Sequence, residues 1–173
     1  MVKLPVGIGL NNLISFLKIV SWEAADILLD YSSLMKNQKN NDDFITLKKD
    51  ASPVTIADLK VNDLVINKLQ EKYGNEIWNY LSEENAKFVS KQNGTNSEWL
   101  WILDPLDGTK DFIQGTEDYA MHLALNYQNK PILGVVLIPK RDELWISDGM
   151  KVWGERSNGK IVKSNLSSNR NLN

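Results

Sequence analysis

Alternating side chains in the second half of the chain constrain the fold more than any other feature. In residues 119–127 every second side chain is large and apolar, and residues 132–139 form another apolar run after a turn sequence at 129–131. A third run, 144–148, follows the polar residues 140–143. A period of two residues is typical of strands with one buried face, and short polar turns join antiparallel neighbours. This part of the chain therefore predicts a series of antiparallel strands.

Two helices are predicted upstream of these strands. Residues 12–35 carry apolar side chains at helical spacing, and residues 50–74 show a similar pattern that ends at Gly74. Short strands are expected at 76–84 and 99–103. Because helices and strands are segregated along the chain, we expect an α+β fold with two helices packed on a mainly antiparallel sheet.

Composition removes several classes of function. The 173 residues include no cysteine and one histidine, which excludes disulfides, thiolate zinc sites and cysteine nucleophiles. A net charge of −2 provides no positive field for a nucleic acid polymer. The N-terminal apolar stretch is interrupted by Lys18 and Glu23, so we expect no membrane span, no signal peptide and a cytoplasmic protein without membrane partners.

Acidic residues recur at the ends of the predicted elements. Asp58 lies near the start of the second helix, Glu83 and Glu84 end one strand, and Asp104 and Asp107 end another. If the two strands end at the same edge of the sheet, their carboxylates converge and repel one another. A divalent cation would relieve that repulsion, and an oxygen-only donor set suits Mg²⁺, Mn²⁺ or Ca²⁺ rather than zinc.

The loop at residues 104–109 also offers backbone groups as ligands. Pro105 stiffens the loop, the carbonyl of Leu106 is available to a metal, and Gly108 lets a backbone N–H approach a ligand closely. If Gly108 and Thr109 begin a helix, their N–H groups form a phosphate site. Each motif alone also has an interpretation without function. The loop at 104–109 could be only a turn, and the acidic residues 83–84 could be only solvent-exposed charges.

Four motifs, in this order, resemble the inositol monophosphatase superfamily of magnesium-dependent phosphatases. They are SPVTIAD at 52–58, LSEE at 81–84, DPLDGTKDFI at 104–113 and KPILGVVLIP at 130–139. Within the superfamily they are most similar to the bacterial CysQ-type 3′(2′),5′-bisphosphate nucleotidases. The resemblance extends over residues 10–155, nearly the whole chain.

The resemblance implies a metal centre that uses Mg²⁺ as cofactor. The ligands would be the carboxylates of Glu83, Asp104 and Asp107 and the carbonyl of Leu106. Glu84 would not bind the metal itself but would lie next to the ligands and hold them in position. The family holds two or three ions, and hydrolysis would proceed by attack of a metal-activated water on the phosphorus.

The resemblance also implies roles in catalysis and substrate binding. Asp58 and Thr109 would orient and deprotonate the attacking water, and Glu83 would be a third catalytic group. The substrate phosphate would contact Gly108, Thr109 and Lys110. The expected partner is a small-molecule phosphate ester.

The family's fold extends beyond this chain, and this departure affects the predicted site. Residues 1–155 would form the metal-binding N-terminal lobe of the αβαβα sugar-phosphatase fold, and residues 156–173 a polar tail at the truncated start of a second lobe. In the family that lobe brings a further aspartate, usually after a tryptophan, but none of the six tryptophans here precedes aspartate. We therefore expect the second metal site to lack a ligand, and the surface left by the missing lobe to promote self-association.

The function implied is removal of the 3′-phosphate of 3′-phosphoadenosine 5′-phosphate. Two alternatives remain open on the sequence. One is an inositol or sugar monophosphatase of the same superfamily, and the other is an inactive remnant that binds metal or phosphate without catalysis.

Overall fold

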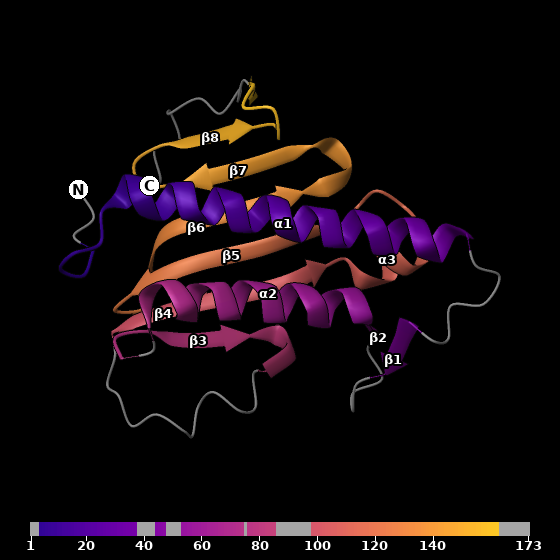
Figure 1. Ribbon diagram of the computed structural model, residues 1–173, viewed down its shortest axis with the longest axis horizontal. Coiled ribbons are helices and arrows are strands. Elements are labelled where there is room, and N and C mark those ends of the chain that lie inside the picture. Colours follow the sequence, from indigo (N-terminus) through magenta and orange to yellow (C-terminus); the bar gives the residue numbers. More distant parts are fainter. Residues whose placement is uncertain (1–3, 38–43, 48–52, 75, 86–97, 163–173) are drawn as a thin grey trace, which may run out of the picture.

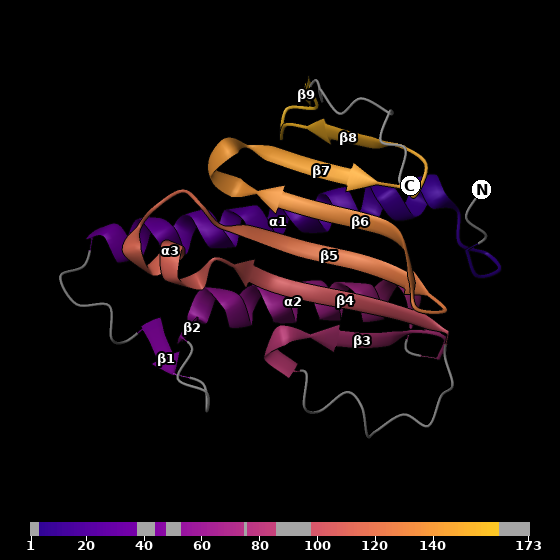
Figure 2. The ribbon, with the colours of Figure 1, turned by 180° about the vertical axis from the view of Figure 1, so that it is seen from behind.

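Two long helices and a seven-stranded sheet make up most of the structure. The computed structural model describes residues 4–37, 44–47, 53–74, 76–85 and 98–162. The two helices lie on one face of the sheet (Figure 1), and the view from behind shows the other face without a long helix (Figure 2). The predicted α+β fold is confirmed. Most of the predicted polar tail, residues 163–173, lies outside the described residues.

The first helix, α1 (Leu10–Asn37), places an apolar stripe against the sheet. Leu13, Leu17, Val20 and Leu28 recur at helical spacing, and all four are buried. Packing of such a stripe, more than intrinsic propensity, stabilises a helix in a protein. No helix in the described ranges is long and apolar enough to cross a membrane.

The second helix, α2 (Ile56–Tyr73), begins later than predicted. Residues Pro53–Thr55, assigned to the helix from sequence, instead form strand β2, which pairs with β1 (Ile45–Leu47). The helix cannot begin earlier because Thr55 is extended, with φ −106° and ψ 164°, and forms a capping box with Asp58. The predicted end is confirmed, since Gly74 follows the last turn with φ 72°.

The large sheet is mixed but mainly antiparallel, as predicted. Among the strands that the structure describes in this sheet, only β3 and β4 pair in parallel, and the other neighbouring pairs are antiparallel. The strands, in spatial order, are β3 (Asn79–Ser82), β4 (Trp99–Asp107), β5 (Ala120–Tyr127), β6 (Lys130–Ile138), β7 (Glu143–Ser147), β8 (Val152–Glu155) and β9 (Ile161–Val162). A short helix, α3 (Thr109–Gln114), connects β4 to β5, and a 3₁₀ turn, η3 (Pro139–Arg141), connects β6 to β7.

The core lies between the two long helices and the inner face of the sheet. Alternate residues of β5 and β6, such as Leu123 and Val135, are buried there, while those between them point to the open face and are half-buried. Trp78 and Trp101 are buried at the β3–β4 side, with ring centroids 5.9 Å apart. The Trp78 ring also lies 6.3 Å from the ring of Tyr73, so this packing ties the first residues of β3 and β4 to the end of α2.

Candidate active site

The parallel pairing of β3 and β4 brings two acidic residues to the same edge of the sheet. Ser82 is the register partner of Leu103, so the residues that follow them, Glu83 and Asp104, come next at the same end of the two strands. Glu83 begins a 3₁₀ turn, η2 (Glu83–Asn85). The expected juxtaposition of these strand ends is therefore a consequence of register.

Asp104 and Asp107 differ from the sequence prediction in one respect: they do not follow a strand but lie in its last part. β4 continues to Asp107, with an irregularity in its pairing with β5 between the two aspartates. Asp104 pairs in register with His122, and Asp107 pairs with Ala120. Bulges at such positions commonly re-aim the side chains beside them.

The environment of Asp104 disfavours its ionised form. Burial, together with the negative charges of Glu83 and Asp107, raises the pKa of Asp104 from its ordinary value of 3.8 to about 6. The backbone N–H of Leu106, which donates to Asp104 Oδ1 at 3.1 Å, acts in the opposite direction on this pKa. Negative charge is therefore concentrated where β3 and β4 end.

This donor set fits a hard divalent cation. Its candidate ligands, Glu83, Asp104, Asp107 and the Leu106 carbonyl, are all oxygen donors, the ligand type that Mg²⁺ prefers. A cation would also offset the repulsion that opposes ionisation of Asp104. The fit is one of donor type and not of side-chain placement, because no three His, Cys, Asp or Glu side chains in the part of the chain that the structure describes form a group that could hold a metal ion.

Thr109 connects the β4 loop to the second helix. Its hydroxyl lies 3.2 Å from Asp58 Oδ1 and 3.0 Å from the carbonyl oxygen of Leu106. Asp58 is fully buried and also accepts hydrogen bonds from the backbone N–H of Thr55 at 2.9 Å and from its hydroxyl at 2.5 Å. Burial raises the pKa of Asp58, and the hydrogen bonds from Thr55 and Thr109 oppose that rise. The capping carboxylate of α2 is thereby linked to the candidate site.

Gly108 occupies a position that excludes a side chain. Its φ is 86°, and a Cβ there would lie 2.6 Å from the carbonyl oxygen of Asp118. Directly after it, α3 begins, with the N–H of Phe112 donating to the Gly108 carbonyl at 2.9 Å. The predicted helix start at residues 108–109 is therefore present, with Gly108 at the cap and Thr109 as its first residue.

The remaining predicted residues are peripheral to these contacts. Glu84 is half-buried in η2, and its N–H donates to the hydroxyl of Ser82 at 3.3 Å. Lys110 is exposed on α3, and within the described ranges no polar contact joins it to the other candidate residues. His122, which the sequence left without a role, lies with Nδ1 3.9 Å from Asp107 Oδ2.

A small cavity beside Asp107 was missed from the sequence. Its volume is about 210 Å³, and its polar lining includes Asp107, Glu117, Asp118 and Arg141. Arg141 lies in the β6–β7 turn, far in sequence from the other three, so only the register of β5 with β6 could have indicated it.

Comparison with known families supports the interpretation of the motifs. Residues 10–172 match the inositol monophosphatase family. The chain belongs to this family. The resemblance read from the four motifs is thereby confirmed, and the inositol monophosphatase fold accounts for the order of helices and strands.

Curated inositol monophosphatase relatives include nucleotidases and inositol phosphatases. The 3′(2′),5′-bisphosphate nucleotidase CysQ of Haemophilus influenzae is 39% identical over 95 residues, which cover 55% of this chain and 34% of that protein. The inositol-1-monophosphatase of Mesorhizobium japonicum is 33% identical over 107 residues, which cover 60% of this chain and 37% of that protein. The chain thus spans only about a third of the length of these two relatives.

Solved structures share the fold of this chain. The extragenic suppressor protein suhB of Bartonella henselae aligns with a TM-score of 0.66 at 24% identity, over 86% of this chain and 53% of that one. The IMPase of Thermotoga maritima aligns with a TM-score of 0.65 at 19% identity, over 89% and 54%. These alignments cover about half of each solved chain.

Proposed function

We propose that this chain forms the metal- and phosphate-binding part of a magnesium-dependent phosphomonoesterase. The observation that carries the proposal is the meeting of Glu83 and Asp104 at the ends of two parallel strands, beside the Asp58–Thr109 contact. Membership of the inositol monophosphatase family supports the same activity.

Glu83, Asp104, Asp107 and the Leu106 carbonyl would hold the ion. A bound Mg²⁺ would polarise the phosphoryl oxygens and lower the pKa of a coordinated water. The chain's own contribution is the crowded carboxylate charge, which raises the pKa of Asp104 and is offset when the ion binds. Glu84, in the turn behind Glu83, would keep that turn in place.

Asp58 and Thr109 would position the attacking water and accept its proton. The Thr109 hydroxyl, held by the Asp58 carboxylate at 3.2 Å, can accept a hydrogen bond from water while donating its own hydrogen to Asp58. Because burial raises the pKa of Asp58, this carboxylate holds a proton more readily than an exposed aspartate. Glu83 would orient the same water from the end of β3, at the same edge of the sheet.

The start of α3 would bind the phosphate group. The N–H groups of Gly108 and Thr109 lie where the helix begins, and the close packing of Gly108 on Asp118 leaves no room for a side chain there. Lys110, in the first turn, would add a positive charge within reach of an anionic substrate.

The substrate we propose is 3′-phosphoadenosine 5′-phosphate, which would lose its 3′-phosphate. The similarity to the Haemophilus influenzae CysQ nucleotidase supports this choice. An inositol or sugar monophosphate is the second candidate, supported by the Mesorhizobium japonicum relative. The third is a binding domain without catalysis, favoured by the finding that no three acidic side chains in the described residues form a group that could hold a metal ion.

The test is phosphate release from adenosine 3′,5′-bisphosphate and from myo-inositol 1-phosphate, with and without magnesium and lithium. We expect magnesium-dependent release, faster from the bisphosphate and inhibited by lithium. Faster release from inositol phosphate would favour the second candidate. Release from neither substrate, with a magnesium-induced rise in melting temperature, would indicate the binding domain.

A further inference from the structure

The cavity beside Asp107 is large enough for part of a substrate. Its 210 Å³ exceed the roughly 30 Å³ that one water occupies but fall below the roughly 300–1,000 Å³ of sites that enclose a whole ligand. It lies between the start of β5 and the turn η3, and Asp107 forms one wall. A molecule with its phosphate at the candidate site could extend its alcohol portion into this space.

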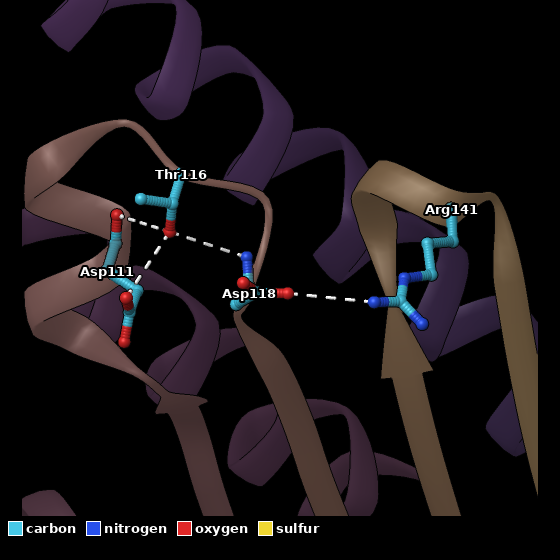
Figure 3. A network of polar contacts seen from close by, with 4 residues as sticks. All are labelled: Asp111, Thr116, Asp118 and Arg141. Atoms are coloured by element: carbon cyan, nitrogen blue, oxygen red, sulfur yellow. Dashed lines mark hydrogen bonds and ion pairs between the residues drawn. The ribbon is translucent and has the colours of Figure 1, made fainter.

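Arg141 and Asp118 face each other in this cavity. Arg141 Nη2 lies 3.6 Å from Asp118 Oδ1 (Figure 3), longer than the roughly 2.7–2.9 Å of a strong charge-assisted hydrogen bond. The two side chains are 59% and 76% exposed, so the pair contributes little to stability. Both therefore keep hydrogen-bonding capacity for a ligand.

The backbone on both sides of the cavity is held in position. Thr116 Oγ1 lies 3.2 Å from the carbonyl of Asp111, and the N–H of Asp118 donates to Thr116 Oγ1 at 3.5 Å (Figure 3). On the opposite side, Arg156 Nη1 donates to the carbonyl of Arg141 at 3.0 Å. Asp118 and Arg141 therefore each belong to a backbone segment that is held by hydrogen bonds, and the segment of Asp118 packs directly against Gly108.

The charge of the cavity decides which part of a substrate it can accept. Among the described lining residues, Arg141 is the one cation, whereas Asp107, Glu117 and Asp118 are acidic. Even with Asp107 neutralised by a metal, two carboxylates face one guanidinium, which disfavours a second phosphate. A hydroxyl group matches this mixture, because it accepts from a guanidinium N–H and donates to a carboxylate.

We propose that the Asp118–Arg141 cavity binds the hydroxyl group adjacent to the ester oxygen of the substrate and makes this chain selective for phosphate esters of vicinal diols. Arg141 donates to the hydroxyl oxygen, and Asp118 accepts its hydrogen. The inference rests on the proposed function, and it assigns Arg141 and Asp118 as specificity-determining residues.

The test compares adenosine 3′,5′-bisphosphate with its 2′-deoxy analogue, which lacks the hydroxyl beside the 3′-ester. For the chain in magnesium, we measure kcat/KM and the rise in melting temperature with each compound. The wild-type chain should prefer the ribose compound about tenfold, the size expected for one hydrogen bond to a charged group. Arg141→Gln and Asp118→Asn should lose this preference because kcat/KM falls for the ribose compound and stays unchanged for the 2′-deoxy analogue. Arg141→Lys should retain part of the preference.

Lys140→Gln is the matched control, because it removes the same charge from the same turn at a residue that does not line the cavity. It should retain the wild-type preference. Equal kcat/KM for the two compounds in wild type, or an equal loss for both in Arg141→Gln, would refute the inference while leaving the phosphatase intact. If Arg141→Gln lowers kcat/KM for adenosine 3′,5′-bisphosphate but not for adenosine 3′-monophosphate, the cavity binds the second phosphate and the inference is refuted. Absence of both hydrolysis and thermal shift would refute the proposed function itself.

Discussion

The hydroxyl of Thr109 lies 3.2 Å from Asp58 Oδ1, across 51 residues of sequence. This contact joins the first turn of α2 to the first turn of α3, and it is accompanied by the 3.0 Å approach of the same hydroxyl to the Leu106 carbonyl. One side chain therefore connects the cap of a long helix with the end of β4, which carries Asp104 and Asp107.

Loss of the Thr109 hydroxyl should destabilise the fold as well as impair catalysis. Thr109→Val keeps the shape of the side chain but leaves the fully buried Asp58 without one of its hydrogen bonds, which should cost about 1–2 kcal/mol. Thr109→Ser retains the hydroxyl and should cost less. Urea denaturation of the metal-free chain measures both, and equal losses in the two variants would contradict a role for the hydrogen bond.

Magnesium should raise the melting temperature of the chain. An ion that binds only the folded state stabilises it by mass action, and the raised pKa of Asp104 indicates repulsion that a cation would relieve. Asp107→Asn should abolish the magnesium-induced shift and cost little metal-free stability, since it removes a like charge. Asp26→Asn, on the exposed side of α1, is the control and should shift like wild type. An Asp107→Asn variant that also shifts like wild type would show that Asp107 is not a ligand.

The metal-free chain should lose part of its stability as the pH rises toward neutrality. The pKa of Asp104 is about 6 in the folded chain and 3.8 as the ordinary value, so the folded state binds this proton more tightly. Its contribution is therefore complete below about pH 4 and is lost as the pH rises through about 6. Because the carboxyl is only half-buried, we expect an effect of about 1 kcal/mol.

Asp104→Asn isolates this contribution from that of Asp58, whose pKa is raised in the same direction. The stability difference between wild type and Asp104→Asn, measured by denaturation in EDTA across this range, should change with pH. A constant difference would argue against the raised pKa of Asp104. In the presence of magnesium the dependence should reverse, because the ion competes with the proton for the carboxylate.

Gly108→Ala should be among the more destabilising single substitutions in the chain. The left-handed φ of 86° and the 2.6 Å approach of the new Cβ to the Asp118 carbonyl together should cost about 3 kcal/mol. Gly159→Ala shares a positive φ of 80° but meets nothing within 4 Å, so it should cost about 1 kcal/mol. Similar losses at the two positions would mean that the contact with Asp118 is relieved by a small backbone shift.

The open face of the sheet should promote self-association. Half-buried apolar residues such as Ile102, Ala124 and Val136 point to this face, over which Figure 2 shows no long helix. Size-exclusion chromatography should show concentration-dependent dimers or larger species, reduced by Val136→Lys. Ile19→Lys, on an exposed position of α1, should not reduce them. A stable wild-type monomer at all concentrations would refute this prediction.

Local patterns in the sequence were sufficient for the two long helices and for most of the strands, whereas the candidate ligands remain a proposal. The alternation in residues 119–127 is a property of consecutive residues, so it predicts β5 without knowledge of its partner. The start of α2 was predicted too early because Pro53–Thr55 are extended only through pairing with β1. That pairing is a contact between separate segments, which a helical period cannot reveal.

The spatial relations within the site depend on contacts between distant segments. The register of β3 with β4 brings Glu83 beside Asp104, the Thr109 hydroxyl reaches Asp58, and the β6–β7 turn carries Arg141 to Asp118. The chain's order of residues specifies which side chains are available and the local conformation of each segment. Which of them meet is settled by packing of the helices on the sheet and by strand register, because these depend on the burial of apolar surface throughout the fold.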